Sequence, residues 1–399
     1  MTDRRQHGGE AQPYHRAYLG WHGLAWAGAT MAYQPFLSFL LPLKVVAIGG
    51  RPDPILLSAA VLLGGVTAGL ANLAWGIVGD RVVAHGGGRR ALILIGLAGT
   101  LFSYVMLALA SSPSALLAAL FCFQVVLNLM LSALVATAAD EVPAHDKGLL
   151  GGVLCIGAPA GAVASVIATL PGISVEDGLF WIGLMVPILI LPYALQRRYP
   201  LQRGSAQVAT ATIPPDQAQT FALLWLVRLM LQTASKAVFF FLVFYFAETV
   251  GEVHPAAIAK FTLVAALIAA PAALLLGRMS DRYNRHRGIL LAMIAAMAGG
   301  LVIMAVQSFW ELAVTGYLVF ACSAAICLAL HSGYTMLHLP AGLESGKGLG
   351  LLNLTNTLPA VAVAALGTAI VPQHGYRMLC WILAVAVALA GGALMLRKD

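Results

Sequence analysis

The sequence predicts an all-α membrane protein in which twelve transmembrane helices form two related six-helix bundles. Of its 399 residues, 60% are hydrophobic and only 10% are charged, whereas about one quarter of the residues in a soluble domain carry charge. Apolar runs of about 20 residues, long enough for a helix to cross a bilayer, recur along the chain. The predicted helices cover residues 17–48, 54–79, 91–111, 113–138, 149–171, 177–196, 220–247, 255–278, 289–308, 310–336, 348–371 and 375–396.

The distribution of basic residues predicts the orientation in the membrane. If both termini are cytoplasmic, 17 of the 23 Lys and Arg residues lie in inner segments, and only Lys44, Arg51 and Arg377 lie in outer ones. This is the positive-inside pattern, so the net charge of +7 requires no nucleic-acid partner. The first apolar run is too long for a cleaved signal peptide. We expect a multi-pass, monomeric protein of a bacterial-type inner membrane.

The chain divides into tails, bundles and a linker. Polar tails are expected at residues 1–16 and 397–399, and helix bundles over 17–196 and 220–396. Residues 197–219 contain three prolines and no apolar period, which indicates a cytoplasmic linker. All five cysteines fall within apolar runs, as packing residues do. No pattern of residues calls for a metal or another cofactor.

The second half of the chain repeats the first. Lys147-Gly-Leu matches Lys347-Gly-Leu, and Pro159 matches Pro359, each at an offset of 200. A further match joins the ends of the second helix of each half, where Gly76, Asp80 and Arg81 correspond to Gly277, Asp281 and Arg282. Six helices, a linker and six more helices in the same orientation are the parallel-repeat plan of large secondary transporters.

In this plan and in these loops the sequence resembles the major facilitator superfamily. The family pattern is Gly, three residues, Asp-Arg, then Gly and two or more basic residues, and the second copy follows it with Asn284 in place of the later Gly. The first copy has a longer loop before Arg89 and Arg90, similar to that of bacterial sucrose and glycoside carriers. The stretch from Gly157 to Gly161 partly resembles a signature of the family's antiporters.

The resemblance implies that these loops latch the two halves together when the carrier faces outward. An acid there can accept from free amides at a helix N-terminus and can pair with a guanidinium. We expect Asp80 to meet the eleventh helix near Gly348, and Arg81 to meet Asp140 or Glu141. The alternative, which we favour for Arg89 and Arg90, is that the charges are solvated. The residues assigned to gating are Gly76, Asp80, Arg81, Asp140, Glu141, Gly277, Asp281 and Arg282.

Two basic residues lie inside the predicted seventh helix, where ionisable side chains are costly. Lys236 lies near mid-membrane, and Arg228 precedes it by eight residues. All 16 acidic residues fall in tails, loops or helix ends. Because an unpaired ammonium should lose its proton or bind an anion, we hypothesise that Lys236, aided by Arg228, binds a negative part of the substrate. The alternatives are that Lys236 faces water and that Arg228 extends to the headgroups.

Further polar and aromatic residues share helix faces in a way that suits a substrate path. The substrate-binding candidates are Trp26, Tyr33, Gln34, Gln124, Asn128, Arg228, Gln232, Lys236, Phe239, Tyr334, Asn353 and Asn356. Coupling to protons would fall to His22 or His331, because histidine exchanges protons near neutral pH. Packing roles for both histidines, and facilitated diffusion, stay open.

Together these features predict a secondary transporter rather than an enzyme, since neither a catalytic constellation nor a Walker-type phosphate loop occurs. The predicted cargo is a small polar organic solute that the protein moves by alternating access. The more specific hypothesis is that this solute is an anion. A neutral sugar or glycoside and a drug or metabolite are alternative cargoes. A membrane receptor or channel is the alternative from another class of protein.

Overall fold

The computed structural model describes residues 17–143, 146–196, 215–251, 254–283, 285–307, 309–337 and 354–396. Eleven helices within them are long and apolar enough to span a membrane, and a shorter apolar helix covers Leu354–Ala369. The predicted all-α membrane fold is confirmed. The predicted tails, residues 197–214 of the predicted linker, and the sites expected at Gly348 and Asn353 lie outside the described residues.

The first half of the chain forms six spans. The first span, Ala17–Gly49, contains a five-residue π-helix, η1 (Phe36–Leu40). Pro35 and Pro42 flank η1. Because proline lacks the N–H that an α-helical turn uses, an α-helical hydrogen bond is missing at each proline, and the wider turn of the π-helix accommodates this loss. The helices of this half are α1 (Ala17–Pro35), α2 (Leu41–Gly49), α3 (Pro54–Ala84), α4 (Arg89–Leu109), α5 (Pro113–Glu141), α6 (Lys147–Leu154), α7 (Gly157–Ala168) and α8 (Val175–Ala194).

The second half follows the same plan. Its helices are α9 (Pro215–Val250), α10 (Pro255–Tyr283), α11 (His286–Val306), α12 (Trp310–Leu337), α14 (Pro359–Ala369) and α15 (Val371–Leu396). We call Leu354–Ala369, which ends in α14, the eleventh span. A kink interrupts α15 at Gly375, whose φ of 73° and ψ of 179° are accessible essentially only to glycine. Beyond the kink, the backbone N–H of Tyr376 donates to the Glu248 carboxylate at 2.9 Å.

Two helices of the first half run past their apolar segments, which corrects the predicted boundaries. α3 ends at Ala84 rather than at residue 79, so Asp80 and Arg81 lie in its last turns and not in a loop. Likewise, α5 continues through Asp140 to Glu141. Nothing in the sequence after Asp80 breaks the helix until Gly86, which adopts a φ of 79°, a left-handed conformation that glycine takes without steric cost.

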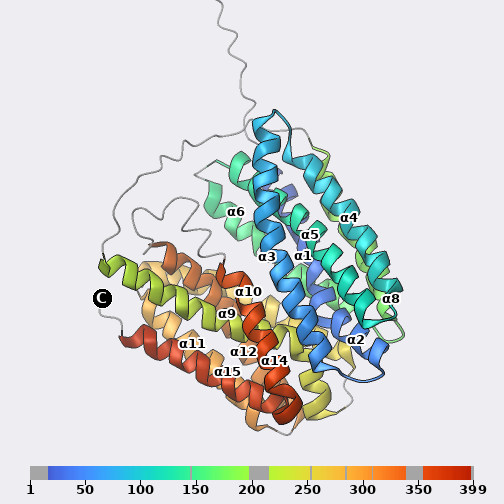
Figure 1. Cartoon of the computed structure of the whole chain (residues 1–399). Helices are drawn as coiled ribbons and strands as arrows, with labels where there is room; N and C mark the ends of the chain where they lie inside the picture. The colour runs from blue at the N-terminus through green and yellow to red at the C-terminus, as the bar shows by residue number, and fades with distance from the viewer. Residues whose placement is uncertain are drawn as a thin grey trace, which may run out of the picture.

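The two halves meet mainly along two pairs of helices, α3 with α14 and α7 with α10, and α9 also contacts η1 and α2. Figure 1 shows the blue-to-green first half beside the yellow-to-red second half, with α3 next to α14 at their junction. In the repeat, α10 corresponds to α3 and α14 to α7. The contact of α3 with α14 is therefore the counterpart of the contact of α10 with α7. Glycines permit the close approach: a Cβ added at Gly69 would lie 2.9 Å from Cγ2 of Thr357.

Close packing also explains the glycines around Pro159. A Cβ at Gly157 would lie 2.7 Å from Oγ1 of Thr30, and one at Gly161 would collide with the side-chain amide of Gln34. These glycines therefore let α7 lie directly against α1. This contact accounts for the glycine pattern without any antiporter role.

Candidate functional site

A cavity of about 390 Å³ lies at the junction of the two halves. Its walls come from α1, α3 and α5 of the first half, and from α9 and the eleventh span of the second. Six of the residues predicted to bind substrate line it: Trp26, Tyr33, Gln124, Asn128, Lys236 and Asn356. Sequence reasoning missed Asn72 and Phe240, which also line the cavity.

Lys236 brings a cation to the cavity wall from α9. Its ammonium donates to the main-chain oxygen of Asn356 in the eleventh span. The side-chain Oδ1 of the same Asn356 accepts from Nε2 of Gln232 at 3.0 Å. In the described part of the chain, no carboxylate lies within ion-pair distance of Lys236. The charge is therefore held by a neutral acceptor beside open space.

Arg228 does not reach the headgroups, which corrects the alternative suggested for it. Its Nη1 donates to Oγ of Ser332 at 2.8 Å, and its Nε donates to Oγ1 of Thr355 at 3.1 Å. These partners lie on α12 and the eleventh span, inside the second half. Arg228 is not among the residues that line the cavity, so its contribution to an anion site is indirect.

The first half supplies amide groups to the opposite wall. Nδ2 of Asn128 donates to the main-chain oxygen of Gln124 at 2.8 Å and lies 3.3 Å from the Gln124 side-chain oxygen. Both side chains are nearly buried, and Gln124 also fits closely against Gly64 of α3. Positioned amides of this kind offer both donors and acceptors to a polar solute.

Other predicted substrate residues lie elsewhere. Gln34 packs between α1 and α7 against Gly161. The ring of Phe239 lies edge-on to that of Phe240, and Tyr334 stacks on His286. Angular position on a helix gave the correct face for Trp26 and Tyr33, but it cannot tell which neighbouring helix already covers a side chain.

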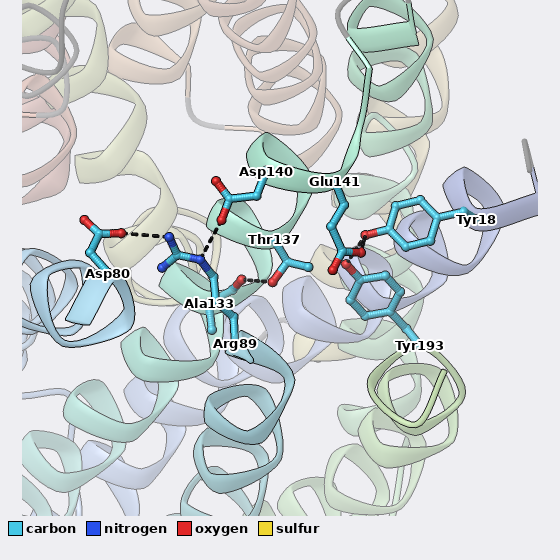
Figure 2. Close-up of polar contacts among 8 residues, drawn as sticks. All are labelled: Tyr18, Asp80, Arg89, Ala133, Thr137, Asp140, Glu141 and Tyr193. Carbon is cyan, nitrogen blue, oxygen red and sulfur yellow. Dashed lines mark hydrogen bonds and ion pairs between the residues drawn. The ribbon is translucent and has the colours of Figure 1, made fainter. Parts of the chain in front are cut away.

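Two of the residues predicted for gating, Asp80 and Asp140, form an ion-pair cluster with Arg89 at one end of the first half (Figure 2). Arg89, at the start of α4, donates from Nη2 to Asp80 Oδ1 at 2.7 Å and from Nε to Asp140 Oδ2 at 2.9 Å. It thereby joins the ends of α3 and α5 (Figure 2). The expected pairing of Arg81 with Asp140 or Glu141 is not the one that the structure shows, because Arg89 and Arg90 hold these acids.

Arg90 and Glu141 form a second, buried pair beside this cluster. Nη2 of Arg90 donates to Oε2 of Glu141 at 2.9 Å, and the two side chains are only 8% and 6% exposed. Tyr18 Oη donates to the same oxygen at 2.6 Å and lies 2.8 Å from Tyr193 Oη (Figure 2). The expectation that Arg89 and Arg90 are solvated is therefore wrong, because both guanidinium groups are largely buried and pair with carboxylates at the ends of α3 and α5.

The matching residues of the second half are arranged more openly. Asp281 lies 3.8 Å from Nδ1 of His286, and its side chain is 80% exposed. The Arg282 guanidinium lies over the ring of Tyr283, 5.8 Å from its centroid. Gly76 has open space around the position of a Cβ, whereas the position at Gly277 lies 3.6 Å from Leu330. The two copies of the motif are thus related in sequence and different in contacts.

Both histidines predicted for proton coupling are buried within their own halves. The ring of His22 lies 5.0 Å from that of Tyr193, edge-on, and stacks on Tyr18. Nδ1 of His331 lies 3.1 Å from Oγ1 of Thr335. Nδ1 of His22 and Nε2 of His331 have no hydrogen-bond partner among the described residues. Neither histidine lines the cavity.

Two halves that repeat each other around a cavity lined by a lysine and side-chain amides are typical of a membrane transport protein. The Major Facilitator Superfamily model matches residues 224–399. Over 394 residues, the chain is 24% identical to the multidrug resistance protein MdtG of Serratia proteamaculans (strain 568), covering 93% of this chain and 90% of that protein. These matches confirm the resemblance to the major facilitator superfamily that the repeated motif predicted, and the proteins that the chain resembles are transporters rather than enzymes.

Solved structures share the fold. A POT family transporter in complex with 5-aminolevulinic acid has a TM-score of 0.75 at 12% identity, covering 94% of this chain and 95% of that one. The nucleoside transporter NupG has a TM-score of 0.69 at 14% identity, covering 95% and 99%. The human organic anion transporter MFSD10 has a TM-score of 0.61 at 17% identity, covering 96% and 100%.

Proposed function

We propose that this protein is a secondary transporter that moves a small organic anion across the inner membrane by alternating access. The observation that carries the proposal is the position of Lys236 in the cavity wall, where a main-chain carbonyl is its partner. A buried ammonium is stabilised by an opposite charge, and a solute carboxylate, sulfonate or phosphate would supply it. The names of the similar proteins differ in cargo, so the cargo is argued from the cavity.

The volume and the lining of the cavity suit a small organic anion. Ligand pockets in proteins measure roughly 300–1,000 Å³, and this one measures about 390 Å³. The indole of Trp26 and the ring of Tyr33 supply flat apolar surface, while Gln124 and Asn128 face the solute with amides. The anionic group binds Lys236, and the amides fix the orientation of the remainder.

The contacts between the halves support a state that is open at the end carrying Asp80. At the opposite end the halves touch closely, since a Cβ at Gly367 of α14 would collide with Ser58 of α3. At the Asp80 end, α6 packs on α1 of its own half. Gly76 and Gly151 have nothing within 4 Å of their Cβ positions among the described residues. With the orientation that the positive-inside rule predicts, this end faces the cytoplasm.

In this mechanism the cluster of Asp80, Arg89 and Asp140 belongs to the gate at that end. The Asp80 side chain is 75% exposed in the open state. Its second oxygen can accept from an amide of the other half when the halves close. Arg89 orients this carboxylate, because its guanidinium pairs with Asp80 and with Asp140 at the same time. Proton coupling is assigned to His22 or His331, each of which has an unpartnered ring nitrogen.

The test is ligand stabilisation of the purified protein with matched anionic and neutral solutes, such as gluconate against glucose. We expect an anion to raise the melting temperature and its neutral analogue to leave it unchanged. Lys236→Gln should weaken anion binding about tenfold or more, because a hydrogen bond to a charged group contributes roughly 1.5–3 kcal/mol. Lys260→Gln, which removes an exposed lysine from α10, is the control and should bind normally. Equal anion binding by wild type and Lys236→Gln would refute the proposal.

A multidrug exporter is the second candidate, and one observation favours it: the similarity to MdtG over most of both chains. Much of the cavity wall is also apolar, including Leu37, Leu127, Leu131 and Phe240. If neutral aromatic dyes stabilise the protein and are transported in counterflow independently of Lys236, this candidate replaces the first. If only neutral sugars bind, the cargo is a sugar.

A further inference from the structure

We infer that the cargo is an amphipathic anion that reaches the cavity from the side, through an apolar groove between α3 and the eleventh span. Its charged group binds Lys236, and its apolar part lies in the groove. The inference rests on the proposed function and adds the chemical class of the substrate and its route to the site.

The groove is a separate space of about 530 Å³ on the flank of the junction. From α3 its wall contains Leu70 and Leu73, which are 66% and 67% exposed. From the eleventh span the wall contains Leu358 and Val361, which are 40% and 47% exposed. Because large apolar side chains exposed on membrane-spanning helices face hydrocarbon, the groove opens toward the lipid chains.

The groove and the cavity lie on two sides of the same contact between α3 and the eleventh span. Gly65, Asn72 and Thr357 line both spaces. Between the two spaces the helices nearly touch, since a Cβ at Gly69 would lie 2.9 Å from Cγ2 of Thr357. An extended alkyl chain is narrow enough to lie in such a groove, and its head can occupy the cavity when this contact between small residues parts. An uncharged solute would leave the Lys236 ammonium at the inner end without an opposite charge.

The charges favour one direction of entry. The cation at the inner end is Lys236, which donates to the main-chain oxygen of Asn356, the residue before the shared Thr357. At the far end the groove reaches Asp80, whose carboxylate is paired with Arg89. An anionic head is therefore attracted toward Lys236 and its tail trails into the groove. A neutral amphiphile lacks this attraction and matches only the apolar half of the site.

The test measures transport and competition by alkanesulfonates in proteoliposomes, because these anions stay charged and cannot cross the bilayer as neutral acids. Methanesulfonate, butanesulfonate and octanesulfonate share one head and differ in tail length. For the wild type we expect the apparent affinity to rise about twofold or more with each methylene that the groove buries. Lys236→Gln should weaken all three anions by a similar factor, because it acts on the head.

The double variant Leu70→Asn, Leu73→Asn tests the groove. It should abolish most of the gain in affinity with tail length, and a melting temperature near that of the wild type shows that the variant is folded. Leu389→Asn is the matched control, because Leu389 is 62% exposed on α15 and lines neither space. The control should keep the full dependence on tail length.

The outcomes separate this inference from the proposed function. If methanesulfonate and octanesulfonate bind equally well, the groove inference is wrong while the anion site stands. The same conclusion follows if Leu389→Asn reduces the dependence on tail length as much as the double variant, or if uncharged octyl compounds compete equally. If no organic anion binds or is transported by the wild type, the proposed function itself fails.

Discussion

Removing one member of the buried Arg90–Glu141 pair should destabilise the protein far more than removing the exposed acid of the neighbouring cluster. The two side chains are 8% and 6% exposed, and their atoms lie 2.9 Å apart. Glu141→Gln leaves the guanidinium of Arg90 buried without an opposite charge, and two of its nitrogens already lack a partner among the described residues. Breaking a buried pair in this way costs about 3–5 kcal/mol.

Arg90→Met has the converse effect, since it leaves the Glu141 carboxylate with the Tyr18 hydroxyl as its remaining donor. The double variant Arg90→Met, Glu141→Gln buries neither charge, so it should be less damaged than the sum of the two single variants. We expect a coupling free energy of about 2 kcal/mol or more.

The assay is unfolding of the purified protein in detergent, followed by circular dichroism for wild type, both single variants and the double variant. Asp80→Asn is the control, because its partner Arg89 keeps Asp140 and an exposed pair contributes less than about 1 kcal/mol. If Glu141→Gln costs less than about 1 kcal/mol, or if the single effects simply add, the pair is hydrated and the reasoning from burial is wrong.

Three further predictions follow from the geometry. Asp80→Asn should leave membrane insertion and melting temperature near wild type while cutting uptake, and normal uptake would remove Asp80 from the gate. Gly375→Ala should cost about 1–3 kcal/mol, because a φ of 73° with a ψ of 179° disfavours a side chain and the new Cβ would meet Glu248; Gly392→Ala, which has open space, should be neutral or slightly stabilising. His22→Phe keeps the ring packing but cannot bind a proton, so proton-driven uptake should stop while counterflow continues; uphill transport by this variant would show that His22 does not couple.

Much of the fold could be predicted because a bilayer imposes it. Hydrocarbon requires long, internally hydrogen-bonded helices, so apolar length located the spans, and the motifs at Asp80 and Asp281 revealed the repeat. Helix ends were harder to predict. α3 and α5 continue beyond their apolar residues, since a helix needs backbone continuity rather than hydrophobicity to extend into the membrane interface.

The candidate site was predicted in part, and the failures have a common physical cause. Lys236, Gln124 and Asn128 lie on the cavity because a polar side chain inside a bundle needs a polar or open neighbour. Arg228 and Gln232 satisfy that need within the second half. Arg89 and Arg90 looked like solvated loop residues, because Asp140 and Glu141, which draw them into the bundle, lie 51 residues away in sequence.

The polar contacts also explain how two such halves can move while each stays intact. The ion pairs that Lys44, Arg89 and Arg90 form with carboxylates all join helices of the first half, and Lys236 is held by a group of the second half. Across the junction the contacts are those of small residues, such as Gly69 with Thr357. Such contacts can part without leaving a buried charge unpaired. A bound anion would act differently from these contacts between small residues. It would place a charged group on Lys236 of the second half, facing Gln124 and Asn128 of the first half. Its binding free energy therefore depends on the distance between the halves, which is the differential affinity that a solute needs in order to shift a conformational equilibrium.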